Sequence, residues 1–266
     1  MAKNQPKVVI LCGGKGTRLK EETEFRPKPL VSIGGVPILL HIMKTYAHYG
    51  FKEFVLCLGY KKEMIKNYFL NFAEMNNDFS IDFSKKNNKG ITYYGKETLR
   101  NWRITFVDTG EEVQTGARIY KVRDYIGKDS DFLLTYGDGV ADINIKDLFY
   151  YHKKANKIGT VTGVHSASVF GLIEHSNGIV KTFREKPKIE DVISGGFFAF
   201  KSQIFDYIDP DDSCVFEDKP LKKLAKEGEL SLYKHDGFWY CMDTQKHVNF
   251  LNDLCDSGRA PWQVWK

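Results

Sequence analysis

Apolar and polar residues are arranged in two ways along the first half of the chain. Runs of consecutive apolar residues, such as those at 7–12 and 52–59, are typical of strands buried on both faces of a parallel sheet. Other segments repeat their apolar residues at helical spacing. The pattern predicts strands at 7–12, 52–59, 104–110 and 131–139 and helices at 36–50, 61–72 and 115–126. This alternation predicts a Rossmann-like α/β fold, in which helices flank a mixed, mostly parallel sheet.

The second half of the chain shows a different pattern. Its apolar runs, for example at 159–165 and 192–200, are short and contain glycines, which favours a smaller antiparallel lobe. Two helices are expected near the end, at 217–227 and 244–256. Since no repeat or low-complexity linker divides the chain, we expect both halves to share one continuous sheet, with a cleft between them.

The composition indicates a globular protein for small anionic ligands. Hydrophobic residues make up 42% of the 266 positions and charged residues 27%, which is ordinary for a packed domain. The net charge of +5 comes without the basic stripe of a nucleic-acid-binding protein. The chain has no run of about 18 apolar residues, so we expect no membrane span. The apolar stretch before the first glycines is too short for a signal peptide, so we expect a cytoplasmic protein. The five cysteines form no C-x-x-C pair, which favours buried thiols over zinc or disulfides.

The sequence GGKGTR at 13–18 follows the first expected strand directly. Glycines let backbone N–H groups approach a phosphate, and Arg18 adds a fixed positive charge. The segment lacks the Walker pattern G-x-x-x-x-G-K-[ST] and the third glycine of the dinucleotide pattern G-x-G-x-x-G. It therefore indicates another kind of phosphate loop, and the alternative is a tight turn between a strand and a helix.

Three further charged residues suit phosphate chemistry. Lys28 lies between two prolines that stiffen its backbone, although it could also be an exposed lysine in a turn. Asp138 follows a buried strand, at the sheet edge where α/β proteins bind ligands. Asp243 follows another apolar run, and two carboxylates with phosphate oxygens form a normal Mg²⁺ shell. Asp243 could instead cap the next helix, and a cap is the role we expect for Asp142.

Another group of residues suits a sugar phosphate. Glu185 and Lys186 are adjacent, and they combine a carboxylate that accepts hydrogen bonds from hydroxyls with an ammonium that binds phosphate. Gly171 and Gly196 offer backbone that a ligand can approach closely. The alternative for Gly195 and Gly196 is a β-bulge.

These motifs occur in the order GGxGTR, PKP, YGD, FG, EKP, GG, MDT, over nearly the whole chain. In this order they resemble the sugar-phosphate nucleotidylyltransferase family. Stretches such as TGARI and the ending GRAPWQVW are similar to its cytidylyltransferase branch, which acts on glucose 1-phosphate. The resemblance implies Mg²⁺-dependent transfer of CMP from CTP to a sugar phosphate, most simply α-D-glucose 1-phosphate, for surface polysaccharide precursors. It also implies a homo-oligomer.

The resemblance assigns a role to each candidate residue. The implied catalytic residues are Arg18, Lys28 and Asp138, and the implied metal ligands are Asp138 and Asp243. The implied nucleotide contacts are Leu11, Gly13, Gly14, Gly16, Thr17, Arg18, Lys28, Thr115 and Arg118. The implied sugar-phosphate contacts are Gly171, Glu185, Lys186, Ser194 and Gly196. One continuous domain would comprise a nucleotide-binding half at 1–142, a sugar-phosphate-binding half at 143–243 that carries the second metal carboxylate, and a C-terminal helix and tail at 244–266.

Several positions depart from the pattern of the glucose enzymes. Val169 stands where they have arginine, Ser194 stands where they have asparagine, and FEDKPL at 216–221 replaces WEQEPL. Another phosphorylated sugar or polyol therefore remains open as the acceptor. A further alternative is a catalytically silent sensor of the same fold, but the presence of all four charged candidates argues against it. Another alternative is a nucleic-acid-modifying protein, which the lack of a basic stripe disfavours. The aromatic tail at 260–265 could pack on a neighbouring subunit or close its own domain.

Overall fold

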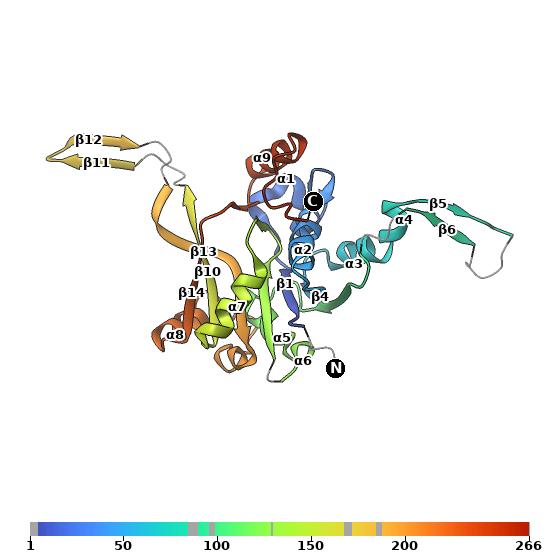
Figure 1. Ribbon diagram of the computed structural model, residues 1–266, viewed down its shortest axis with the longest axis horizontal. Helices are drawn as coiled ribbons and strands as arrows, with labels where there is room; N and C mark the ends of the chain where they lie inside the picture. Colours follow the sequence, from blue (N-terminus) through green and yellow to red (C-terminus); the bar gives the residue numbers. More distant parts are fainter. Residues whose placement is uncertain are drawn as a thin grey trace.

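A seven-stranded sheet forms the centre of the computed structural model, which describes residues 5–84, 90–95, 99–128, 130–167, 172–184 and 188–265 (Figure 1). Its strands are β1 (Val8–Cys12), β4 (Glu53–Leu58), β7 (Arg103–Asp108), β8 (Asp131–Tyr136), β10 (Gly159–Ala167), β13 (Lys188–Lys201) and β14 (Leu230–His235). They lie in the order β14-β10-β13-β8-β1-β4-β7. Only β13 runs antiparallel to its neighbours in this sheet, β8 and β10. The sheet is thus mixed, mostly parallel and continuous across both halves of the chain, as the sequence predicted.

Residues of β1 alternate between two core clusters on opposite faces of the sheet. Val8 and Ile10 belong to the cluster that helix α2 (Ile38–His48) completes, whereas Val9 belongs to the cluster of α5 (Thr115–Lys121). Burial on both faces explains why this strand is apolar throughout. Further helices extend the two clusters, namely α7 (Ile145–Ala155) and α9 (Gln245–Asp256) in the first and α6 (Arg123–Ile126) and α8 (Lys219–Lys226) in the second.

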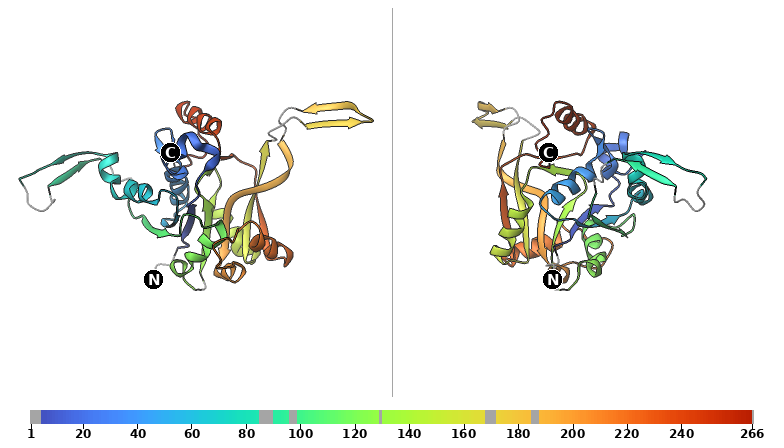
Figure 2. Two further views of the ribbon diagram at one scale, coloured as in Figure 1. Left: turned by 180° about the vertical axis from the view of Figure 1, so that it is seen from behind. Right: turned by 45° about the vertical axis from the view of Figure 1, so that its right-hand side comes forward.

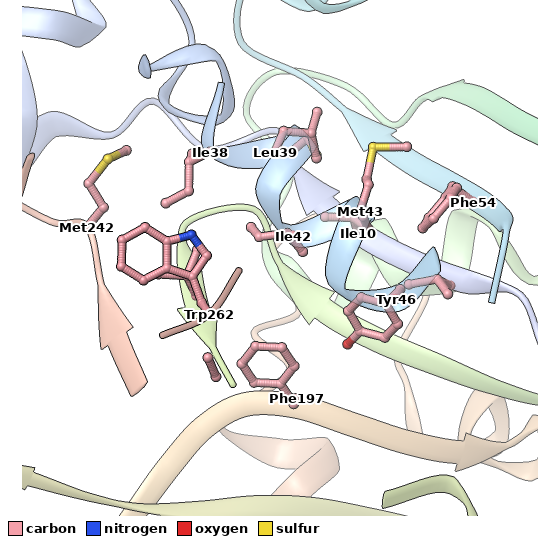
Figure 3. Packing of buried hydrophobic residues seen from close by; sticks show 14 of the residues in the cluster. Ile10, Ile38, Leu39, Ile42, Met43, Tyr46, Phe54, Phe197, Met242 and Trp262 are labelled. Atoms are coloured by element: carbon pink, nitrogen blue, oxygen red, sulfur yellow. The ribbon is translucent and has the colours of Figure 1, made fainter. Parts of the chain in front are cut away.

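The aromatic tail packs into the core of its own chain. Trp262 is fully buried and stacks on Phe238 with ring centroids 5.5 Å apart. Figure 3 shows its ring beside Ile38 and Met242. Its indole N–H donates to Nδ1 of His41 on α2 at 3.2 Å. Of the two placements that the sequence left open, closure of its own domain is the one observed.

Two hairpins project from opposite sides of the body (Figures 1 and 2). One pairs β5 (Asp78–Ile81) with β6 (Ile91–Tyr94), and the other pairs β11 (Leu172–Ser176) with β12 (Ile179–Arg184). The remaining elements are η1 (Thr17–Leu19), α1 (Lys20–Thr23), η2 (Lys28–Leu30), β2 (Ser32–Ile33), β3 (Val36–Pro37), α3 (Lys62–Leu70), α4 (Phe72–Asn76), β9 (Gly139–Ala141), η3 (Ser202–Tyr207) and β15 (Trp239–Cys241).

The expected elements of the first half are present with small differences. The helix expected at 115–126 is divided at Val122 into α5 and α6. Of the second-half strands, β10 and β13 are antiparallel to each other and extend the central sheet, whereas β11 and β12 form a separate two-stranded hairpin. Within the described residues, no helix has the length and apolar character that crossing a membrane requires.

Candidate active site

The glycine-rich segment 13–16 carries the chain from β1 into the 3-10 helix η1. Gly16 has a φ of 64°, in the left-handed region that favours glycine. At Gly13, an added Cβ would lie 2.1 Å from Nη1 of Arg118. Glycine is therefore required at Gly16 by the backbone conformation and at Gly13 by the lack of space.

This segment lines a cavity of about 300 Å³ at the carboxyl ends of β1 and β8. All nine residues that the resemblance assigned to the nucleotide contribute to its wall. The other lining residues are Cys12, Pro29, Val113, Gln114, Tyr136, Gly137 and Asp138. The segment is a tight turn between a strand and a helix, as the alternative had it, and it also lines a cavity large enough for part of a nucleotide.

Lys28, Asp138, Asp243 and Arg18 form a charged cluster beside this cavity. The Lys28 ammonium lies 2.6 Å from Oδ2 of Asp138 and 2.7 Å from Oδ1 of Asp243. Arg18 Nη2 lies 2.9 Å from the same Asp243 oxygen. The Lys28 side chain is only 11% exposed, so the alternative of a solvent-exposed lysine in a turn is wrong.

The electrostatics of this cluster keep both signs of charge at neutral pH. Burial opposes the charge of Lys28, but the Asp138 charge and the hydrogen bonds to both carboxylates outweigh it and raise the pKa of Lys28. Burial likewise opposes the Asp243 charge, and the Lys28 and Arg18 cations outweigh it, so the pKa of Asp243 is lowered. Thr244, and not Asp243, is the N-cap residue of α9. The Asp243 side chain is therefore directed to the cations and not to the helix.

The carboxylates of Asp138 and Asp243 fit a magnesium ion. Their oxygens and the Cys241 sulfur lie within 4.8 Å of one another. Mg²⁺ prefers hard oxygen ligands, of which the two aspartates supply one each or more. Burial and the two neighbouring carboxylates raise the pKa of Cys241, so this thiol stays protonated and is unsuited to Mg²⁺. From the sequence, Cys241 was expected to be a buried thiol like the other cysteines, because no motif placed it near Asp138.

Arg118 holds the glycine loop in place through hydrogen bonds. Its Nη1 donates to Gly110 O at 2.6 Å and to Thr109 Oγ1 at 2.8 Å. Its Nη2 donates to Gly13 O at 3.1 Å and to Glu111 O at 3.0 Å. The buried guanidinium thus joins the loop after β1 to the loop after β7. It contributes to the cavity wall, but both terminal nitrogens already bind the protein, and its predicted contact with the nucleotide stays a prediction.

Thr115, Tyr136 and Glu217 form a second group. We call it the acceptor cluster because its oxygens accept hydrogen bonds; the name does not refer to the sugar-phosphate acceptor. Thr115 begins α5 and Tyr136 ends β8, and both line the cavity. The Thr115 hydroxyl donates to Oε2 of Glu217 at 2.7 Å, and the Tyr136 hydroxyl donates to Oε1 of the same carboxylate. Sequence reasoning missed Glu217 and Tyr136. The only signal for Glu217 was the glutamate that FEDKPL shares with the WEQEPL of the glucose enzymes.

The predicted sugar-phosphate contacts are described only in part. Ser194 is exposed on β13, opposite Gly163 of β10. Gly196 has a φ of 76°, and an added Cβ would lie 2.6 Å from the Tyr136 ring. Pairing of β13 with β10 shifts register next to Ser194, which agrees with a bulge at the glycine pair. Gly171, Glu185 and Lys186 lie outside the described residues, as does Val169. The sugar-phosphate site stays a prediction.

The role predicted for Asp142 is wrong. The N-cap of α7 is Asn144, whose side chain accepts from the backbone N–H of Lys146 at 3.1 Å and of Asp147 at 3.3 Å. Asp142 lies two residues too early for that geometry. Its Oδ1 instead lies 3.0 Å from Nε2 of His235.

Comparison with known proteins places this geometry in a family. The nucleotidyl transferase family model matches residues 7–255. The probable glucose-1-phosphate cytidylyltransferase of Bacillus subtilis is 47% identical over 97% of this chain and all of that protein. The glucose-1-phosphate cytidylyltransferase of Salmonella typhi is 43% identical over 98% of this chain and all of that protein.

Solved structures share the fold at lower identity. HddC from Yersinia pseudotuberculosis superimposes with a TM-score of 0.67 at 22% identity, covering 94% of this chain and 99% of that one. A putative glucose-1-phosphate thymidylyltransferase from Bacillus anthracis gives 0.69 at 18% identity, covering 94% and 95%. The resemblance and the fold class expected from the sequence are confirmed. The chain belongs to the nucleotidyl transferase family.

Proposed function

We propose that this protein transfers CMP from CTP to α-D-glucose 1-phosphate and releases pyrophosphate and CDP-glucose. The observation that carries the proposal is its similarity, over nearly the whole chain, to two proteins named as glucose-1-phosphate cytidylyltransferases. The charged cluster beside the glycine-lined cavity supports it, because a nucleoside triphosphate needs both features.

The reaction needs positioning and charge neutralisation more than proton transfer. A phosphate oxygen of the sugar phosphate is already anionic, so it attacks the α-phosphorus of CTP without a general base, and the bond to pyrophosphate breaks. Arg18 and Lys28 would balance the negative charge on the triphosphate and on the departing pyrophosphate. Asp138 and Asp243 would hold Mg²⁺, which when bound neutralises phosphate charge and orients the phosphate oxygens.

The assembly and the cellular setting belong to the same proposal. Exposed apolar side chains gather on the two hairpins, including Phe79 and Ile81 on one and Ile173 and Phe183 on the other. Isolated two-stranded hairpins are marginally stable in water, so contact with further copies of the chain would stabilise them. A homo-oligomer in the cytoplasm, supplying an activated sugar for surface polysaccharides, fits these features.

The identity of the phosphorylated compound that accepts CMP is the least constrained part of the proposal. Ser194 is shorter than the asparagine of the glucose pattern, which favours a different phosphorylated sugar or polyol as the second candidate. Pyrophosphate release from CTP and Mg²⁺ with a panel of sugar 1-phosphates and polyol phosphates tests both. Turnover with glucose 1-phosphate supports the first candidate, and turnover with another acceptor alone supports the second. Inactivity with every acceptor would contradict the enzymatic proposal.

A further inference from the structure

The acceptor cluster leaves few hydrogen-bond donors for a ligand. The Thr115 hydroxyl carries one hydrogen, which it donates to Glu217, and the same oxygen accepts from the Phe216 backbone N–H at 2.9 Å. The Tyr136 hydroxyl also directs its hydrogen at Glu217. An ionised carboxylate has no hydrogen to donate. The two hydroxyls, which line the cavity, therefore offer a ligand there only oxygen lone pairs.

The Tyr136 phenol stays protonated in this arrangement. A phenol ordinarily loses its proton only at about pH 10. Its hydrogen is thus present at neutral pH and points away from a ligand. The nearby Gln114 side chain does not change this pattern, because an amide can present either its oxygen or its NH₂ group.

A carboxylate next to a site for a polyanion calls for an explanation. Glu217 repels the triphosphate, and among the described residues it forms no ion pair with a lysine or arginine that would offset this. Its hydrogen bonds come from the two neutral hydroxyls of Thr115 and Tyr136. A ligand group that donates hydrogen bonds would turn this cost into affinity.

The position of the charged cluster decides which part of the nucleotide meets the acceptor cluster. Arg18, Lys28 and Asp138 attract the phosphates and their metal, so the base contacts the remaining wall, which includes Thr115 and Tyr136. Cytosine carries an amino group at C4, where uracil and thymine carry a carbonyl oxygen. The Thr115 and Tyr136 oxygens can accept from this amino group, whereas they have no free hydrogen to donate to the carbonyl oxygen of uracil or thymine.

We propose that Glu217, together with the Thr115 and Tyr136 hydroxyls that it orients, selects cytosine over uracil and thymine. This inference rests on the proposed function, because it assumes that the cavity holds a pyrimidine nucleoside triphosphate. Glu217 is not among the residues that line the cavity, so it acts as a positioning residue for the two hydroxyls, which do line it.

The test compares nucleotide binding by isothermal titration calorimetry in the presence of Mg²⁺. We expect the unaltered protein to bind CTP about a hundredfold more tightly than UTP. The NH₂ group of Glu217→Gln can donate to one of the two hydroxyls, which frees the hydrogen of that hydroxyl for the uracil oxygen, so the ratio of the two Kd values should fall about tenfold or more. The matched control is Asp218→Asn, which removes a charge from the next residue, whose carboxylate pairs with Lys222. It should leave the ratio unchanged.

The two proposals fail in different ways. Equal weakening of CTP and UTP by Glu217→Gln, with an unchanged ratio, would assign Glu217 a structural role and overturn the inference. Inactivity of the unaltered protein with every acceptor would overturn the proposed function while the binding ratio is still measured.

A second ligand guards against a variant that does not fold. The triphosphate of 2-pyrimidinone riboside has hydrogen in place of the amino group and adds no bulk. It should bind the unaltered protein about tenfold more weakly than CTP, and equal binding would overturn the inference.

Discussion

The charged cluster and the acceptor cluster differ in how their residues are paired. Lys28 bridges two carboxylates within 2.7 Å, and Arg18 adds a second cation, so this group offers cations for phosphate and carboxylates for a metal ion. In the acceptor cluster a single carboxylate takes the hydrogens of two neutral hydroxyls. Charge of both signs suits chemistry at phosphorus, whereas fixed acceptor directions suit discrimination between bases.

Loss of a carboxylate from the charged cluster should have the largest effect. Asp138→Asn and Asp243→Asn should each lower kcat by about a hundredfold or more, because each removes charge from the proposed metal site. Pyrophosphate release under saturating CTP and acceptor measures this, with Asp124→Asn on α6 as an exposed control. Full activity of Asp243→Asn would reduce that residue to a partner of the two cations.

Arg118 connects the two loops beside both clusters, and its loss should have the next largest effect. Arg118→Met leaves several buried carbonyl oxygens without a donor, so it should cost about 2 kcal/mol or more of the free energy of unfolding. It should also lower kcat/KM for CTP about tenfold, because the Gly13 loop loses its support. Urea unfolding and initial rates measure the two effects. Arg123→Met, on exposed α6, should change neither by much.

The pairing within the charged cluster should appear in the dependence of stability on pH. Because the pKa of Asp243 is lowered on folding, its contribution is present above the unfolded value near 3.8 and is lost as pH falls through the lower folded value. Lys28 acts in the opposite direction, with a contribution present below about 10.5 and lost as pH rises through its raised pKa. The Tm of metal-free protein should exceed that of Asp243→Asn at neutral pH, and the difference should shrink below pH 3.8. A difference that is constant with pH would contradict the pairing.

Replacement of Cys241 should have the smallest effect, although its sulfur lies close to both aspartates. Burial and the neighbouring carboxylates keep the thiol protonated, so it should not bind Mg²⁺. Cys241→Ser should therefore change kcat and the Mg²⁺ concentration for half-maximal activity by less than about threefold. A large shift in the Mg²⁺ dependence would make Cys241 part of the metal site.

Local signals in the sequence were sufficient for the sheet and for the positions of the phosphate and metal candidates. The apolar runs at 8–12 and 131–136 predicted buried strands, because both faces of the sheet are covered. Gly16 and Asp138 lie within four residues of the ends of these strands, and strand ends meet at one edge of a parallel sheet. The sequence thus determined the fold class, the family and most of the cavity wall.

Tertiary structure alone decided which of these residues touch. Glu217 meets Thr115 across 102 positions of the chain, and no periodicity or motif reports a contact of that kind. Cys241 lies beside Asp138 because β15 pairs with β9. Asp142 faces His235, and Asn144 caps the next helix in its place. Hydrogen-bond direction and local charge depend on distances of a few ångströms between distant segments, and these distances exist only once the sheet has formed.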